Sequence, residues 1–208
     1  SYTVGDIWGY VTGGILQEGD FDGVGANGKP LYHGPYFKGG QAYPGYIWYQ
    51  DLDHDGVITT GLNTVDDPGD RKVIGNNAPR YRYNITANFQ YKGFDLDLMF
   101  QGVGKRDYWL SSTSSYWGNG AGSWEVYNNS WTPERTDAKF PMYGSGTGSY
   151  PQTGYLLDAS YIKLKQVILG YTFPRALINK IGLEKLRLNL AAYNLFTISD
   201  MPDRKSVV

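Results

Sequence analysis

The strictest constraint in the sequence is the segment from Arg80 to Tyr91, where apolar and polar side chains alternate without interruption. The apolar positions are Tyr81, Tyr83, Ile85, Ala87, Phe89 and Tyr91, and the polar positions are Arg80, Arg82, Asn84, Thr86, Asn88 and Gln90. A period of two places these sets on opposite faces of an extended strand, whereas an α-helix needs a period of 3.6. The segment is therefore predicted to be a β-strand with one apolar and one polar face.

A second strand follows directly and should pair with the first. Lys92-Gly93 has the composition of a tight hairpin turn. After it, Phe94, Leu96, Leu98 and Phe100 alternate with Asp95, Asp97, Met99 and Gln101. The two segments predict an antiparallel hairpin with one apolar and one polar face.

A second strand pair is expected at 161–173 and 186–196. In the first of these segments the apolar positions change from even to odd numbers near Gln166, and a β-bulge would produce that change. Between the strands, Pro174 begins a segment through Ile181 that is predicted to form a helical turn ending at Gly182.

Composition supports an all-β fold. The 208 residues include 19 tyrosines, 6 tryptophans and 28 glycines, which is typical of many short strands and turns. The formal net charge of −1 argues against a nucleic-acid partner, because phosphate binding needs an excess of Lys and Arg. Cysteine is absent, which excludes disulfides and thiolate zinc sites. The sequence has no long apolar run. This does not exclude a membrane β-barrel, because its strands need only about ten residues of alternating polarity.

Long loops are expected on either side of the hairpin. The sequence divides into a strand with long loops at 1–79, the hairpin at 80–104, long loops at 105–160, the strand pair at 161–197 and an atypical tail at 198–208. Residues 18–41 read as a glycine-rich loop, and 124–131 as a short helical piece. Four loop tryptophans could stack against sugar rings, although packing or an interfacial girdle explains them more simply. They are Trp109, Trp117, Trp124 and Trp131.

An acidic loop at 51–58 resembles the first half of a calcium-binding loop. Carboxylates occupy its first, third and fifth positions, glycine its sixth and Val57 its seventh, where a backbone carbonyl would bind the ion. The usual acidic twelfth residue is replaced by Leu62, so a further carboxylate would have to come from Asp66, Asp67 or Asp70. The candidate metal ligands are Asp51, Asp53, Asp55, Val57, Asp66 and Asp67. Two interpretations stay open, a Ca²⁺ site and an Asx-rich turn without metal.

Catalysis is not favoured by the sequence. Glu125 and Glu134 lie among the loop aromatics and are the first candidates for a glycosidase pair, but their spacing does not establish the required separation. The two histidines, His33 and His54, are not accompanied by a Gly-x-Ser-x-Gly motif. His54 is expected to face solvent, because a hard oxygen site has no use for imidazole.

Several short sequence segments, taken in order, resemble the C-terminal part of the SusC/RagA family of TonB-dependent outer-membrane transporters. The resemblance extends from about Gly5 to Thr197. It is carried by Trp8-Gly9-Tyr10-Val11, Gly14-Ile15-Leu16-Gln17, Pro44-Gly45-Tyr46-Ile47, Asp51-Leu52-Asp53-His54-Asp55-Gly56, Asp70-Arg71-Lys72-Val73-Ile74-Gly75-Asn76, Tyr91-Lys92-Gly93-Phe94-Asp95, Phe100-Gln101-Gly102-Val103-Gly104, Leu157-Asp158-Ala159-Ser160-Tyr161-Ile162-Lys163-Leu164-Lys165, Leu169-Gly170-Tyr171 and Asn194-Leu195-Phe196.

The resemblance implies antiparallel hairpins of a partial outer-membrane β-barrel in Bacteroidetes-type bacteria. It implies import of oligosaccharides or peptides, with TonB and a SusD-like surface lipoprotein as partners and membrane lipid around the wall. The family's plug, its TonB-contacting segment and its closing strand are not expected in this chain, and residues 201–208 depart from the family pattern. The alternative is a soluble carbohydrate-binding β-sandwich or a small glycan hydrolase.

Overall fold

A computed structural model describes residues 3–109 and 124–201. The backbone folds into two compact units. Unit 1 contains the described residues of Ser1–Ala78 and Asp107–Leu157, and unit 2 contains Pro79–Arg106 and Asp158–Met201. Each unit is described by itself.

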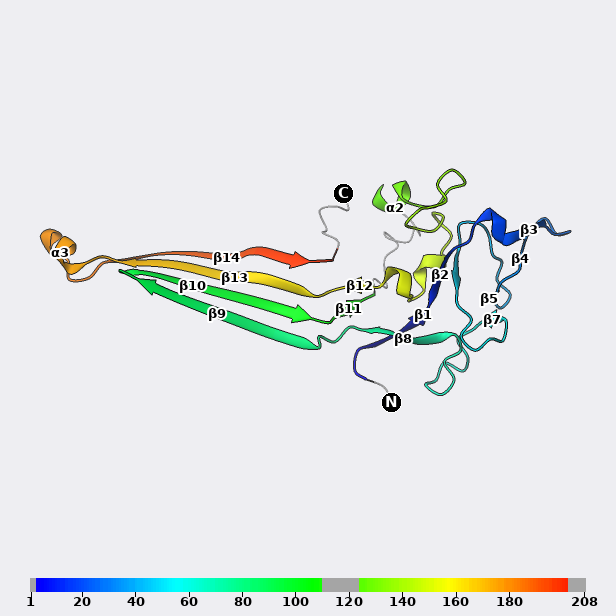
Figure 1. Ribbon diagram of the computed structural model, residues 1–208, viewed down its shortest axis with the longest axis horizontal. Coiled ribbons are helices and arrows are strands. Elements are labelled where there is room, and N and C mark those ends of the chain that lie inside the picture. Colours follow the sequence, from blue (N-terminus) through cyan, green and yellow to red (C-terminus); the bar gives the residue numbers. More distant parts are fainter. Residues whose placement is uncertain (1–2, 110–123, 202–208) are drawn as a thin grey trace. The chain divides into compact units, whose positions relative to one another are not determined.

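Unit 2 is a four-stranded antiparallel sheet. Its strands are β9 (Tyr81–Tyr91), β10 (Phe94–Gly104), β13 (Tyr161–Thr172) and β14 (Arg187–Ser199), arranged in the order β14-β13-β10-β9. Figure 1 shows these long strands side by side. The sheet does not close on itself, so the prediction of an all-β chain with a partial barrel is confirmed.

The hairpin between β9 and β10 has the tight turn that the sequence predicts. Tyr91 pairs with Phe94, which leaves only Lys92 and Gly93 in the turn. Both residues have positive φ, 46° at Lys92 and 86° at Gly93. Two left-handed residues match the right-handed twist of the flanking strands, which explains why glycine stands at the second position.

The predicted bulge near Gln166 is also present. The pairing of β13 shifts between Leu164 and Gln166 against both of its neighbours. Against β10, Lys165 is the extra residue. Against β14, Lys165 alone lies opposite Asn194 and Leu195, so there the extra residue is on β14. On β14 the residues opposite the shift include Asn194, which has a φ of 54°. The bulge returns the apolar side chains after Gln166 to the face that they occupied before it.

The connection between β13 and β14 is helical. It contains α3 (Arg175–Ile178) and the 3₁₀ turn η4 (Asn179–Ile181), and Gly182 follows with a φ of 76°. A left-handed glycine ends a helix without a Cβ penalty, as expected from the sequence.

Unit 1 consists of short strand pairs and turns. β1 (Asp6–Tyr10) pairs with β8 (Arg71–Asn76), β2 (Thr12–Ile15) with β6 (Ile47–Tyr49), β3 (Phe21–Val24) with β4 (Pro30–Tyr32), and β5 (Tyr36–Phe37) with β7 (Val57–Ile58). The remaining elements are η1 (Glu18–Asp20), β11 (Asp107–Tyr108), α2 (Trp124–Asn128), η2 (Thr147–Ser149), η3 (Thr153–Tyr155) and β12 (Leu157–Asp158), which reaches the boundary with unit 2. Residues 18–41, expected as a loop, contain β3, β4 and β5. Phe21 packs on Tyr32 where β3 pairs with β4, and β5 pairs with β7.

The core of unit 1 is aromatic. Tyr10, Ile47, Tyr49 and Ile58 are at most 2% exposed, and the ring of Phe37 lies edge-on to Tyr10 at 5.6 Å. Burial raises the pKa of Tyr49, so its hydroxyl stays protonated and donates to the carbonyl of Thr147 at 2.6 Å.

Buried polar groups tie this core to the later part of the sequence. Gln152 is completely buried, and its Nε2 donates to the Tyr49 hydroxyl oxygen at 3.1 Å. Its Oε1 accepts from Thr12 Oγ1 at 3.0 Å. Burial also raises the pKa of Tyr36 to about 12. The loops of unit 1 thus form a packed body, because their buried polar side chains find partners inside it.

Candidate functional site

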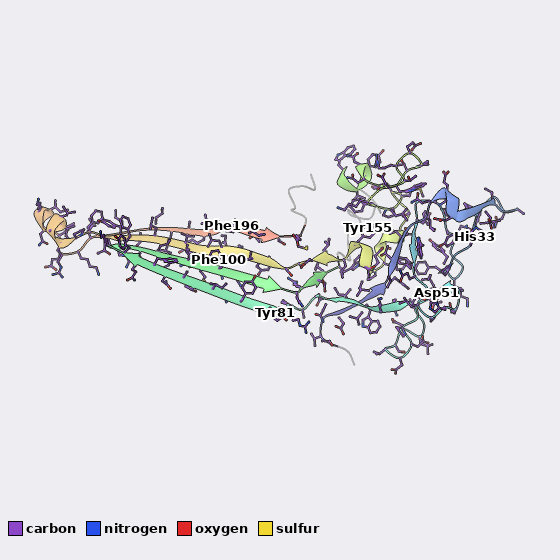
Figure 2. The ribbon with its side chains drawn as sticks, in the orientation of Figure 1. His33, Asp51, Tyr81, Phe100, Tyr155 and Phe196 are labelled. Atoms are coloured by element: carbon purple, nitrogen blue, oxygen red, sulfur yellow. The ribbon has the colours of Figure 1, made fainter. Side chains whose placement is uncertain are left out.

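The sheet of unit 2 has one face that is apolar across all four strands. Directly opposed residues of neighbouring strands lie on the same face, so the pairing defines rows across the sheet. The apolar rows are Tyr91–Phe94–Tyr171–Leu188, Phe89–Leu96–Leu169–Leu190, Ala87–Leu98–Val167–Ala192, Ile85–Phe100–Leu164–Phe196 and Tyr83–Gly102–Ile162–Ile198. In Figure 2, Phe100 and Phe196 mark this sheet.

This face is exposed to its surroundings. Leu190 is 71% exposed, Tyr91 70% and Ile198 63%. Within unit 2, no second sheet covers these side chains. A continuous exposed apolar surface of this extent marks a membrane or protein contact, because water makes such exposure unfavourable.

Aromatic residues gather at both ends of the apolar face. At the hairpin end, the ring centroids of Phe94 and Tyr171 lie 4.4 Å apart, and Tyr171 contacts Phe173 at 4.8 Å. At the other end, Tyr81 and Tyr83 begin β9. Aromatic girdles at two levels are typical of strands that cross a bilayer.

Strand length agrees with that arrangement. The strands of the sheet contain 11 to 13 residues. A tilted strand needs roughly 9–11 residues to cross the hydrocarbon core. The last strand extends to Ser199, beyond the predicted end at Phe196, and the apolar Ile198 continues the alternation that indicates this longer strand.

In the described part of the chain, no helix has the length and apolar character needed to span a membrane.

The opposite face of the sheet is predominantly polar. Its rows are Gln90–Asp95–Gly170–Asn189, Asn88–Asp97–Ile168–Ala191, Thr86–Met99–Gln166–Tyr193, Asn84–Gln101–Lys163–Thr197 and Arg82–Val103–Tyr161–Ser199. Near the hairpin, Arg187 forms an ion pair with Asp95 at 2.6 Å, and Asn88 donates a hydrogen bond to Asp97. A wall with two such faces separates an apolar solvent from a polar one.

The acidic loop of unit 1 brings three carboxylates together. Oxygen atoms of Asp51, Asp53 and Asp70 lie within 4.8 Å of one another. Figure 2 labels Asp51 in this loop. Asp51 accepts hydrogen bonds from the backbone N–H groups of His54 at 2.7 Å and Gly56 at 2.8 Å, which shape the loop.

Asp70 anchors this loop from the start of β8. Its side chain is completely buried, and its two oxygens accept from the backbone N–H of Leu52 at 2.8 Å and of Thr59 at 2.7 Å. It therefore holds the two ends of the loop together while presenting its carboxylate to Asp51 and Asp53.

The other predicted metal ligands lie close by in different roles. Asp55 accepts a hydrogen bond from the backbone N–H of Val57 at 2.8 Å. Asp67 belongs to a neighbouring turn, where its N–H donates to Thr64 Oγ1 at 3.1 Å, and Asp66 is exposed. The cluster of three carboxylates includes Asp70, which was one of the alternatives for the missing twelfth ligand. It includes neither Asp66 nor Asp67.

The pKa values of Asp51 and Asp53 shift in opposite directions. Loss of hydration opposes ionisation of Asp51, but the backbone hydrogen bonds from Gly56 and His54 outweigh it and lower the pKa of its carboxyl. A hydrogen bond from the Asp55 backbone lowers the pKa of Asp53, but loss of hydration and repulsion from Asp70 outweigh it, so its pKa is raised. Repulsion of this kind is what a bound cation would relieve.

The candidate tryptophans occupy different environments. Trp109 and Trp131 are buried, and Trp131 Nε1 donates to Gln17 Oε1 at 3.0 Å. Trp124, at the start of α2, is 70% exposed and packs edge-on against Tyr127 at 5.8 Å. Trp117 lies outside the described residues. Of the described three, only Trp124 presents its side chain to a ligand in solution.

The candidate catalytic residues do not assemble into a described site. Glu134 is exposed in the turn after Trp131. Glu125 lies in α2, and its side chain is not among the described parts of the structure. His33 Nδ1 lies 3.0 Å from Asp22 Oδ2 on the exposed β3–β4 hairpin, and His54 is exposed, as expected.

Comparison with known proteins places these features in a family. No family model matches the chain. TonB-dependent receptor P3 of Formosa agariphila is 31% identical over 201 residues, which cover 96% of the chain and 18% of the receptor. The resemblance to the TonB-dependent receptors is confirmed. Receptor P26 of the same organism is 30% identical over 156 residues, covering 73% of the chain and 15% of that receptor. The chain thus spans less than a fifth of these curated TonB-dependent receptors.

Solved structures agree on the fold. The RagAB peptide importer in the open-open state matches with a TM-score of 0.57 and 21% identity, covering 94% of the chain and 19% of the importer chain. Its closed-closed state matches with a TM-score of 0.56 and 16% identity, covering 94% and 20%. The segment therefore shares its fold with part of the RagAB importer chain.

Proposed function

We propose that the chain forms wall and loops of an outer-membrane transporter that imports oligosaccharides or peptides. The observation that carries this proposal is the four-stranded sheet whose apolar rows extend unbroken from β9 to β14. Such a face suits lipid, and the polar face suits a water-filled interior. In the proposed whole protein, TonB supplies the energy and a SusD-like lipoprotein covers the entrance.

The alternative of a soluble carbohydrate-binding sandwich or glycan hydrolase receives less support. A sandwich buries one face of each sheet against the other. In unit 2 the apolar face has no second sheet against it.

Uptake by cells tests the transport proposal. Cells with and without the gene for the full-length protein would be given fluorescent oligosaccharides and peptides, in the presence and absence of a protonophore. We expect the gene to be needed for entry of at least one ligand class, and we expect the protonophore to abolish that entry. Uptake that is independent of the gene for both classes would refute the proposal.

For the acidic loop we propose a Ca²⁺ site in which Asp51, Asp53 and Asp70 supply the carboxylates. Three carboxylates within 4.8 Å and a raised Asp53 pKa fit a hard cation, which takes six to eight oxygen ligands. Asp55 and the Val57 carbonyl are the further ligands that the loop spacing predicts.

Isothermal titration of the full-length protein with calcium tests this site. We expect Asp53→Ala and Asp55→Ala to weaken binding strongly. Asp66→Ala decides whether the exposed carboxylate of the next turn contributes, and we expect it to leave binding unchanged. Absence of binding heat in the unmodified protein would refute the proposal.

A further inference from the structure

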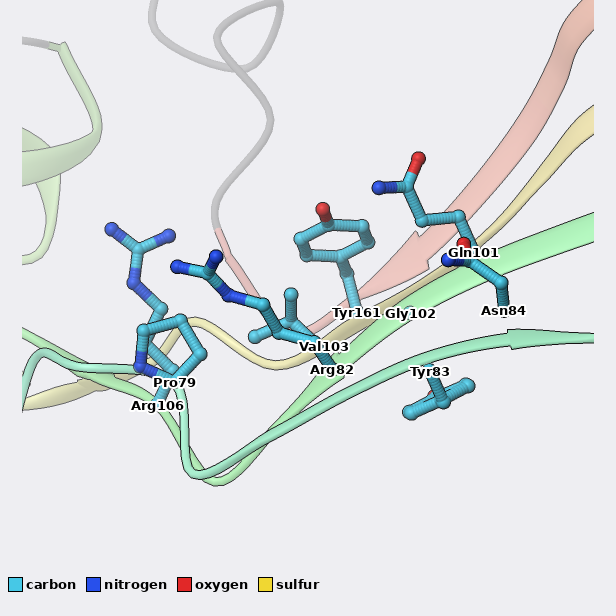
Figure 3. A pocket seen from close by; sticks show the side chains of 9 residues that line it. All are labelled: Pro79, Arg82, Tyr83, Asn84, Gln101, Gly102, Val103, Arg106 and Tyr161. Carbon is cyan, nitrogen blue, oxygen red and sulfur yellow. The ribbon is translucent and has the colours of Figure 1, made fainter.

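A hollow on the polar face of unit 2 gathers positive charge. Its volume is about 340 Å³, which lies within the usual range of roughly 300–1,000 Å³ for small-ligand sites. Figure 3 shows Arg82 and Arg106 extending on the same side of the sheet, with Tyr161 beside them. Gln101 and Asn84 continue the lining along the strands.

The pairing of the strands fixes these residues on one face. Val103 pairs with Arg82 on one side and with Tyr161 on the other. In the next row, Gln101 pairs with Asn84 and with Lys163, which adds a third positive charge at this end. The strand register thus places Arg82, Tyr161, Gln101 and Asn84 on one face, and Arg106 follows the end of β10.

Tyr83 also lines the hollow, although its side chain lies on the opposite face, as Figure 3 shows. Gly102 pairs with Tyr83, and a Cβ on this glycine would come within 2.1 Å of the tyrosine ring. The absence of a side chain at Gly102 lets the ring pack flat on the sheet beneath the polar groups.

The hollow offers donors suited to an oxyanion. Among the described residues, the Arg82 side chain has no hydrogen bond or ion pair, and a guanidinium binds a carboxylate or sulfate with two parallel hydrogen bonds. Arg106 contributes to the proposed site only as a positive charge beside Arg82. Asp158, the acidic residue near the start of β13, accepts a hydrogen bond from Ser160 N at 2.8 Å and does not line the hollow.

Charge on the polar face is separated along the strands. The positive hollow lies at the end of the sheet where β9 begins, whereas Asp95 and Asp97 lie near the two-residue turn at the opposite end. Outer-membrane barrels place short turns in the periplasm and long loops outside the cell. The hollow therefore lies toward the extracellular end of the wall, where a ligand enters.

We propose that the hollow of Arg82, Arg106 and Tyr161 binds the carboxylate group of an acidic ligand entering the transporter. This inference rests on the transport function proposed above and names the chemistry of its ligand. The oxyanion could come from an acidic oligosaccharide or from an acidic peptide, and the guanidinium recognises both in the same way.

Binding to the full-length transporter in detergent tests the proposal with matched probes. The probes are an oligogalacturonate and its carboxyl-reduced neutral form, and a glutamate-rich peptide with its glutamine counterpart. We expect at least one acidic probe to bind about tenfold or more tightly than its neutral partner, since hydrogen bonds to charged groups discriminate by this order. The pair that shows the difference identifies the source of the oxyanion.

Substitutions of Arg82 test whether this residue causes the preference for acidic probes. Arg82→Gln should reduce the preference for the acidic probe about tenfold, and Arg82→Lys should restore part of it, because lysine keeps the charge but not the paired donors. Lys180→Gln removes the same charge from η4 and should change nothing. Heat-dependent gel mobility confirms that each variant is folded.

Equal binding of acidic and neutral probes, absence of binding by all four, or equal effects of Arg82→Gln and Lys180→Gln would each overturn the inference. These failures are distinct from failure of the transport function. If energy-dependent uptake of a neutral ligand persists while the acidic preference is absent, only the inference about the hollow is refuted.

Discussion

Asp70 shows how one buried carboxylate can organise a loop. Both of its oxygens accept backbone N–H groups, one at each end of the segment from Leu52 to Thr59. A carboxylate has two acceptor atoms, whereas an amide has one acceptor and one donor. The side chain therefore cannot be replaced by its amide without leaving a donor facing a donor.

We predict that Asp70→Asn in the full-length protein destabilises the acidic loop by about 1–3 kcal/mol, the cost of leaving a buried donor unsatisfied. Hydrogen exchange at the Leu52 and Thr59 amides measures this effect and should become faster. Asp66→Asn is the matched control, because Asp66 is exposed. Equal exchange rates in the two variants would contradict the role of Asp70.

The two shifted carboxyls of the loop should titrate in a defined order. Without calcium, we predict that the carboxyl of Asp51 titrates below its usual pKa of 3.8 and that of Asp53 above it. The stabilising contribution of Asp51 is present above pH 3.8 and is lost as the pH falls through its lowered pKa. The charged form of Asp53 opposes folding, and protonation through its raised pKa relieves this. Carboxyl carbon NMR shifts measure both midpoints, and the reverse order would show the pKa arguments to be wrong.

Residue patterns predicted part of the candidate site. The spacing of Asp51, Asp53 and Asp55 identified the loop, because these ligands are adjacent in sequence. Asp70 was only one of three alternatives for the further carboxylate, since its position depends on how the turn at 60–69 folds. Arg82 and Arg106 were not recognised as neighbours, because sequence spacing does not show that the β9–β10 hairpin brings the start of β9 beside the residues that follow β10.

At the scale of elements, the turn between β9 and β10 depends on glycine. A Cβ at residue 93 would meet the Thr172 carbonyl oxygen at 2.7 Å, and the φ of 86° disfavours any side chain there. Neighbouring Lys92 also has positive φ, at 46°.

We therefore predict that Gly93→Ala reduces the free energy of unfolding by about 1–2 kcal/mol, the cost of a left-handed conformation for a non-glycine residue. Urea titration of the full-length protein in lipid vesicles measures this. Lys92→Asn is the matched control, because asparagine tolerates positive φ and should be neutral. Equal stability of the two variants would contradict the proposed strain.

Long elements were more predictable than short ones. The β9–β10 hairpin follows from uninterrupted alternation, and the Lys165 bulge from one change of phase. In contrast, β3, β4 and β5 were not predicted, because strands of two to four residues carry too little periodicity. Those strands depend on contacts such as that of Phe21 with Tyr32, which cannot be predicted from the sequence pattern.

At the scale of the whole molecule, the two faces of the sheet should respond differently to charge. Ala87 and Thr86 are consecutive residues near the middle of β9, one in an apolar row and one in a polar row. In a membrane wall, Ala87 would face lipid and Thr86 the interior.

We predict that Ala87→Arg destabilises the membrane-inserted full-length protein by about 2–4 kcal/mol, the cost of a cationic side chain near the bilayer midplane. Thr86→Arg should cost little, because its side chain remains in water. Folding yield into lipid vesicles, assayed by heat-dependent gel mobility, compares the two. A larger loss for Thr86→Arg would reverse the assignment of the faces.

The order of strands along the chain has a consequence for how the wall forms. β9 and β10 are joined by two residues and β13 and β14 by the α3 connection, so each pair can form by short-range closure. Strands β10 and β13 are neighbours in the sheet, but residues 105–160 separate them in the sequence. Because distant segments must lose more chain entropy before they meet, the β10–β13 seam should be the late and slow step of folding. The bulge at Lys165 lies in this seam, where it fixes the alignment of two preformed hairpins.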